Sequence, residues 1–174
     1  MTTLVKGSRA TAQRHLQESP NGAILIGDVG VGKTTLVRTP RMVSANQLAL
    51  EYQASGIEAV KALINNQLQY QGLKVVIDDL GTEERVKNFG TELDPINYVI
   101  QRIYDINQVA DQKIKLYLTT NLNEKDLVER YGQRLVDRIW EMCDRAVVID
   151  TNLRRAWLKK NSYNLMQESH LQRS

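Results

Sequence analysis

The chain has 174 residues, of which 42% are hydrophobic and 25% charged, and its formal net charge is +3. This length suits one domain with a sizeable core. No apolar run approaches the length of a membrane span, residues 1–8 lack a signal-peptide core, and the single cysteine cannot form an internal disulfide. We therefore expect a cytoplasmic protein without membrane contact.

Basic residues gather at the C-terminal end of the chain. Residues 151–174 contain five basic residues and one acidic residue, which leaves the rest of the chain slightly negative. This asymmetry favours a polyanionic partner. A solvated end helix explains it equally well.

The first predicted elements lead into a glycine-rich loop. Ser8–Glu18 has the composition of a basic helix and ends before a Pro-Asn-Gly turn. The apolar run Ala23–Ile26 then predicts a strand. The next stretch reads G-D-V-G-V-G-K-T-T and fits the phosphate-loop pattern G-x-x-x-x-G-K-[ST] at every position.

The residues of this loop suit a nucleotide phosphate and its metal ion. Glycines let the backbone turn tightly and direct N–H groups at an anion, and the following helix begins at the same point. Lys33 can reach the β- and γ-phosphates, and the Thr34 hydroxyl can bind Mg²⁺. The predicted nucleotide-binding residues are Gly27, Asp28, Val29, Gly30, Val31, Gly32, Lys33, Thr34 and Thr35.

The helix that begins at Lys33 is predicted to be short, because Pro40 cannot continue it. A short strand at Arg41–Ser44 and two helices, Asn46–Ala54 and Ile57–Gln69, are expected next. The strand Lys74–Asp78 ends in acid. There we assign Asp78 to the metal ion and Asp79 to orienting and polarising the attacking water, the alternative being two turn acids at a strand end.

Thr82–Gly90 is polar and predicts a loop, and Asp94-Pro95 predicts a helix start. Apolar residues of that helix recur at helical spacing: Ile96, Val99, Ile100, Ile103, Ile106 and Val109. The strand Ile114–Thr119 follows. Just beyond it, Asn121 can hydrogen-bond the attacking water and the γ-phosphate, or it can simply form an Asx turn.

Two further helices, Asn123–Arg130 and Gln133–Met142, and a strand at Ala146–Ile149 complete the predicted elements. The last helix places Arg134 and Arg138 on one face. Either arginine could reach a nucleotide on a neighbouring subunit, or both could pair with Asp137 and Glu141 within the helix. Past the final strand, Arg154 or Arg155 could close over the phosphates of the same subunit, or both could be ordinary surface residues.

Strands that alternate with helices predict an α/β fold with a parallel sheet, whose ligands bind at the carboxyl ends of the strands. The motifs G-D-V-G-V-G-K-T-T, V-V-I-D-D-L-G-T-E, L-T-T-N-L and R-Y-G-Q-R-L-V-D-R-I-W-E-M, with the closing V-V-I-D-T-N-L-R, lie in that order. From about Ala23 to Arg155 the sequence resembles the AAA+ ATPase branch of bacterial and phage replicative-helicase loaders and transposition helper ATPases.

This resemblance implies a P-loop NTPase fold, a three-layer sandwich whose five-stranded parallel sheet has the order 5-1-4-3-2. It implies residues 1–22 as an N-terminal basic helix and linker, 23–150 as the AAA+ core, and 151–174 as a short basic lid. It also implies ATP and Mg²⁺ as cofactors, and a homo-oligomer with nucleotide between subunits. The implied roles are Walker A for Lys33 and Thr34, Walker B for Asp78 and Asp79, sensor 1 for Asn121, arginine finger for Arg134 and sensor 2 for Arg154.

The function expected from the resemblance is ATP hydrolysis that assists helicase loading on single-stranded DNA during replication. The alternative is an ATP-gated adaptor for a transposase or another partner, with little turnover. Only residues 1–22 precede the first predicted strand, and the Walker A helix is shortened; both features favour the adaptor. DNA binding, if mostly through phosphates, would weaken steeply with salt.

Overall fold

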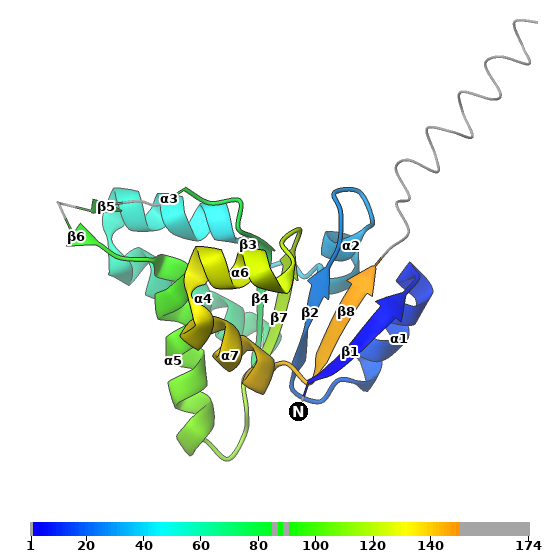
Figure 1. The fold of residues 1–174 in the computed structure, drawn as a ribbon. Helices are drawn as coiled ribbons and strands as arrows, with labels where there is room; N and C mark the ends of the chain where they lie inside the picture. Colours follow the sequence, from blue (N-terminus) through cyan, green and yellow to red (C-terminus); the bar gives the residue numbers. More distant parts are fainter. Residues whose placement is uncertain (1, 85–86, 89–90, 150–174) are drawn as a thin grey trace, which may run out of the picture.

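The computed structural model describes residues 2–84, 87–88 and 91–149 (Figure 1). At its centre is a six-stranded sheet in the order β1-β8-β2-β7-β4-β3, with parallel pairing throughout. Its strands are β1 (Thr3–Gly7), β2 (Gly22–Ile26), β3 (Val43–Ser44), β4 (Lys74–Leu80), β7 (Lys115–Thr120) and β8 (Arg145–Ile149). The predicted α/β class with a parallel sheet is therefore confirmed.

The predicted number of strands was wrong. The sheet has six strands because β1 pairs with β8, from Thr3 opposite Arg145 to Gly7 opposite Ile149. Residues 1–22 thus contribute a strand as well as the expected helix. With β1 included, the order of the whole sheet also differs from 5-1-4-3-2. The other five strands run β8-β2-β7-β4-β3, which is 5-1-4-3-2 when they are counted from β2.

Helices cover both faces of the sheet (Figure 1). The helices are α1 (Arg9–Glu18), α2 (Lys33–Val37), α3 (Ala45–Ser55), α4 (Ile57–Gln71), α5 (Pro95–Val109), α6 (Glu124–Tyr131) and α7 (Gln133–Met142). Among the described residues, no helix has the length and apolarity needed to cross a membrane.

The strands alternate their side chains between two cores. Ile24 and Ile77 pack with α3 to α7 in the larger core, whereas Leu25 and Val76 pack with α1 and α2 in the smaller one. Such alternation is the period-two pattern of a strand buried on both faces. The sheet is therefore the middle of three layers.

The predicted helix boundaries agree closely with the structure. Asp94 and Asn123 cap α5 and α6, since their side chains accept hydrogen bonds from backbone N–H groups of the first turn. The helix that follows the phosphate loop, α2, has only five residues, as Pro40 predicts. Because α2 is short, it covers little of the sheet.

One prediction outside the site needs correction. Residues 82–90 are not all loop, because β5 (Lys87–Asn88) pairs antiparallel with β6 (Thr91–Glu92). The apolar residues that recur at helical spacing do form a helix, α5. The positions of that series from Ile96 to Ile103 are buried, whereas Val109, the last residue of the helix, is 86% exposed.

Candidate phosphate-binding site

The glycine-rich loop joins β2 to α2 at the carboxyl end of the sheet (Figure 1). Gly27, Gly30 and Gly32 have φ values of 155°, 88° and 90°, a region that favours glycine. A Cβ at Gly27 would lie 2.5 Å from the backbone oxygen of Ile149. The loop can therefore pack against β8 only with glycine at this position.

The apolar residues of the loop have different environments. Val31 is buried among residues of the smaller core, whereas Val29 is largely exposed. Thr35 is also exposed, on the outer side of α2. Val31 thus anchors the loop to the sheet, and the backbone around it curves about the side chain of Lys33.

Lys33 lies at the centre of this curve and is only 5% exposed. Its Nζ donates hydrogen bonds to the carbonyl oxygens of Gly27 (2.7 Å) and Asp28 (3.0 Å) and to Oδ1 of Asn121 (2.6 Å). Burial lowers the pKa of Lys33 below its ordinary value, and the carboxylates of Asp79, Asp78 and Asp28 oppose that shift. Asn121 is therefore in direct contact with the loop lysine, across the ends of β2 and β7.

Asp78 joins the loop to two strands. Its Oδ1 accepts hydrogen bonds from Oγ1 of Thr34 at 3.0 Å and from Oγ1 of Thr119 at 2.6 Å. The hydroxyl of Thr34 and the carboxylate of Asp78 are hard oxygen ligands held within reach of one ion. Mg²⁺ is usually held by one or two such protein oxygens together with phosphate oxygens, so this pair fits the predicted metal site.

Asp79 has an unusual backbone for its residue type. Its φ of 56° is in the left-handed region, where no other non-glycine residue of the described chain lies. Aspartate and asparagine tolerate this region better than longer side chains such as glutamate. The pairing of β4 with β7 shifts register between Ile77 and Leu80, and the amide of Asp79 donates to Oγ1 of Thr119 (2.9 Å).

The environment of the Asp79 side chain changes its acidity. Burial raises the pKa of Asp79, the negative charge of Asp78 raises it further, and Lys33 opposes both effects. A carboxylate with a raised pKa accepts a proton more readily than an ordinary aspartate. This property suits the predicted role of Asp79 in polarising an attacking water.

The arginines of α7 differ in their contacts. Arg138 is held by Oε1 of Gln101 and by the ring of Tyr104, 5.0 Å from its centroid. Arg134 is exposed and has no hydrogen bond or ion pair with any described residue. The structure therefore does not bring Arg134 into contact with the Lys33 cluster, and Arg134 is free to reach outward.

The alternative of pairing within α7 does not hold for the described side chains. Asp137 accepts from Nε2 of Gln133, and Glu141 accepts from the hydroxyl of Tyr104. Both acids that could have paired with the arginines of this helix are thus bound by neutral donors. Arg154 and Arg155, the candidates for a second arginine over the phosphates, lie outside the described residues.

Two groups of polar residues near the site were not predicted. Thr119 bridges the adjacent carboxylates, since its hydroxyl donates to Asp78 and accepts from the amide of Asp79. Glu83 is buried and bound by Arg130 and Tyr131 of α6. Both lie within motifs that the sequence already singled out, T-T-N and D-D-L-G-T-E, but pattern alone did not separate them from their neighbours.

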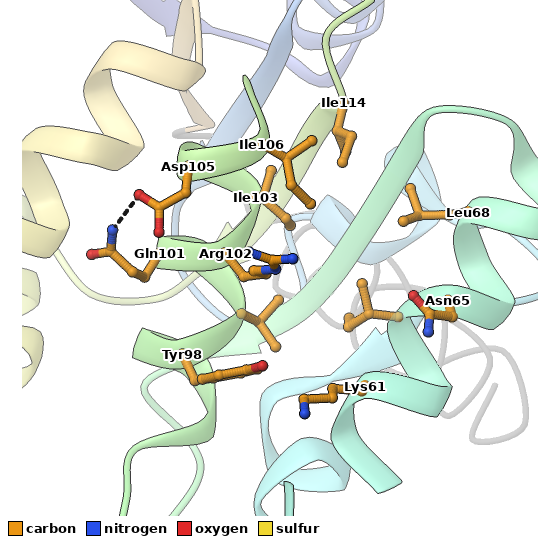
Figure 2. Close-up of a pocket in the computed structure, with 12 residues that line it drawn as sticks. Lys61, Asn65, Leu68, Tyr98, Gln101, Arg102, Ile103, Asp105, Ile106 and Ile114 are labelled. Carbon is orange, nitrogen blue, oxygen red and sulfur yellow. Dashed lines mark hydrogen bonds between the residues drawn. The ribbon is translucent and has the colours of Figure 1, made fainter. Parts of the chain in front are cut away.

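A cavity lies away from the phosphate loop, between α4 and α5 (Figure 2). This cavity of about 570 Å³ has an apolar floor that includes Ile64 and Ile103, and a rim that includes Lys61, Tyr98 and Arg102. None of the predicted site residues lines it. This cavity and the predicted chemistry therefore lie in different parts of the molecule.

Comparisons with known proteins leave the family open. No protein-family model and no curated protein matches this sequence. The functional argument therefore depends on the residues and geometry described above.

Proposed function

We propose that this chain binds ATP with Mg²⁺ in the Gly27–Thr35 loop and hydrolyses it to ADP and phosphate. The observation that carries the proposal is the convergence of Lys33, Thr34, Asp78 and Asn121 from three segments of the chain, with hydrogen bonds of 2.6 Å between Lys33 and Asn121 and 3.0 Å between Thr34 and Asp78. The left-handed conformations of Gly30 and Gly32 support the same proposal, in which the fold is that of a P-loop NTPase.

The charges of the site support a need for a metal ion. The Lys33 ammonium lies within electrostatic range of three carboxylates, those of Asp28, Asp78 and Asp79. A triphosphate adds several negative charges to this excess. The hydroxyl of Thr34 and the carboxylate of Asp78 would hold Mg²⁺, which would supply positive charge against the negative charge of the phosphates.

In this proposal each residue has a separate task. Lys33 exchanges carbonyl acceptors for β- and γ-phosphate oxygens, and Asn121 holds the γ-phosphate and the water beside it. Asp79 orients that water and takes its proton. Arg134 extends to the nucleotide of a neighbouring copy, where its charge stabilises the transition state.

The wider role rests on the sequence resemblance. We propose an AAA+ assembly of identical subunits that acts on single-stranded DNA beside a replicative helicase. The short α2 favours a second candidate, an ATP-gated adaptor for a transposase in which turnover is slow. The two candidates share the nucleotide site and differ in the rate of hydrolysis and in the partner that the bound state recruits.

ATP turnover per subunit, measured against protein concentration with and without single-stranded DNA, tests the proposal. We expect a rate that rises with concentration, because sites completed between subunits form only in the assembly, and a further rise with DNA. Stable ATP binding with no turnover at any concentration would favour the adaptor. Absence of ATP binding in the presence of Mg²⁺ would contradict both.

A further inference from the structure

A buried ionic cluster ties the turn after β4 to the end of α6. The side chain of Glu83 is only 3% exposed, and its Oε1 accepts from Arg130 Nη2 at 3.1 Å and from the hydroxyl of Tyr131 at 2.6 Å. Arg130 also donates to the backbone oxygen of Glu83 at 2.5 Å. The other carboxylate oxygen accepts from the amide of Gly81 at 3.0 Å. Every oxygen of Glu83 is thus bound.

Stability alone does not account for this cluster. Removing a carboxylate and a guanidinium from water has a large desolvation cost, and well-packed apolar residues often stabilise such a position as well or better. Burial also raises the pKa of Tyr131, as does its hydrogen bond to Glu83, so the phenol stays a donor. What these directed bonds provide is a fixed geometry for the turn.

That turn begins at Asp79. The carbonyl of Asp79 accepts from the amide of Thr82 at 3.3 Å and from its hydroxyl at 2.8 Å. The amide of Asp79 is bound to Thr119, so the start of the turn is fixed by β7 and its end by Glu83. The left-handed backbone of Asp79 lies between these two attachments. A shift of Glu83 would therefore change the direction of the Asp79 carboxylate.

The other side of the cluster leads to Arg134. Arg130 and Tyr131 are the last residues of α6, and the single residue Gly132 separates them from α7. Arg134 is the second residue of α7. A displacement of Arg134 by contact with a neighbouring copy would thus be transmitted to Arg130 through the short connection between α6 and α7.

We propose that Glu83 is a positioning residue that couples Asp79 to Arg134. Held by Arg130 and Tyr131, it makes the orientation of the Asp79 carboxylate depend on where the corner between α6 and α7 lies. Engagement of Arg134 by a second subunit then orients the Asp79 carboxylate toward the attacking water. This inference rests on the proposed nucleotide site and adds to it a means by which assembly regulates hydrolysis.

The substitution Glu83→Gln tests the coupling with almost no change in volume. Glutamine has one carbonyl oxygen, so it cannot accept from α6 and from the amide of Gly81 at the same time. We expect kcat for ATP to fall about tenfold to a hundredfold, as for a misplaced catalytic group, while the ATP dissociation constant changes less than about twofold. The matched control is Glu58→Gln, at an exposed glutamate of α4 that pairs only with Lys61 among the described residues.

Hydrogen exchange gives a readout that does not depend on turnover. In the parent protein, MgATP should change protection of residues 79–83 and 124–138 together; in Glu83→Gln the second segment should no longer respond. If Glu83→Gln does not fold, Tyr131→Phe takes its place, with Tyr104→Phe as the surface control. Tyr104 also donates its hydroxyl to a glutamate, Glu141, at 2.7 Å.

The outcomes separate this inference from the proposed function. A folded variant that keeps both the parent kcat and the joint exchange response would overturn the coupling and leave the nucleotide site intact. If the parent protein binds ATP without turnover, hydrogen exchange alone tests the coupling. A joint response that persists in Glu83→Gln would then overturn it. A parent that binds no nucleotide would overturn both proposals.

Discussion

The loop around Lys33 and the cavity between α4 and α5 offer a ligand very different surroundings. At the loop, polar atoms from α2, from β4 and from the end of β7 converge, with hydrogen bonds as short as 2.6 Å. The cavity measures about 570 Å³, and its floor is made of isoleucine, leucine and valine side chains. The comparison shows that the convergence of polar groups and the apolar cavity lie in different parts of this fold, and our proposed nucleotide site rests on the former.

The largest expected effect concerns a residue outside both regions. Substitution of Arg134 by alanine should lower ATP turnover about a thousandfold, because an arginine supplied to a neighbouring site stabilises transition-state charge. ATP affinity of the dilute protein should stay within about twofold of the parent value, since Arg134 contacts no described residue of the loop. Steady-state assays at high protein concentration measure this loss.

The matched control for Arg134 is Arg138→Ala, at an arginine held by Gln101 and Tyr104. It should lower the melting temperature, because these contacts are lost, and it should lower turnover far less than Arg134→Ala does. If the two substitutions reduce turnover equally, Arg134 has no special role.

A large effect on binding is expected at the loop itself. The Lys33→Ala protein should bind ATP about a hundredfold more weakly, because the Lys33 ammonium is the only cation that the described residues place in the cluster. Titration with a fluorescent ATP analogue measures the affinity. Lys125→Ala, at an exposed lysine of α6, should bind like the parent. Equal ATP affinity in the parent and in Lys33→Ala would contradict the proposed nucleotide site at this loop.

Asp79→Asn should lower activity and raise stability. The pKa of Asp79 is raised in the fold, so the charged carboxylate is disfavoured at neutral pH, and asparagine removes that penalty while tolerating the same backbone. The melting temperature at pH 7 should therefore exceed that of the parent. The gain should shrink as the pH falls toward 3.8, the ordinary aspartate value, where the parent side chain becomes protonated in both states.

Thermal unfolding followed by circular dichroism at several pH values measures this difference. A variant less stable than the parent at pH 7, or a gain that does not depend on pH, would contradict the described environment of Asp79.

The smallest effect is expected at the cavity. Arg102 lines its rim, so Arg102→Gln removes a charge from this region without touching the loop. Affinity for MgATP and turnover should both remain within about twofold of the parent values. Parallel titration and turnover assays check this, and a tenfold loss of ATP affinity would move the nucleotide away from Lys33.

Much of the fold was predictable because its signals are local. The glycine pattern of residues 27–32, the caps at Asp94 and Asn123, and the period of each apolar run depend only on neighbouring residues. The strand β1 was not predicted because its five residues form no buried run, and its partner β8 lies about 140 residues away.

The residues of the candidate site likewise divide into those that local patterns predict and those that depend on distant contacts. The convergence of Lys33, Thr34, Asp78 and Asn121 could be predicted because each lies in the first turn of α2 or near the carboxyl end of a strand, at the same edge of the sheet. The contact between Glu83 and Arg130 spans 47 residues and depends on how α6 packs, which no local pattern encodes. The contacts of Arg138 with Gln101 and Tyr104 of α5, which distinguish it from the exposed Arg134, could not be predicted for the same reason: they depend on how helices pack.

The measurement that tests the central claim most directly is a calorimetric titration of the parent protein with ATP, in Mg²⁺ and in EDTA. One cation among three carboxylates leaves the cluster too negative to hold a triphosphate well without a metal ion. We expect one ATP per chain in Mg²⁺ and an affinity at least about tenfold lower in EDTA. No binding in Mg²⁺, or the same affinity in both conditions, would contradict the proposed nucleotide site.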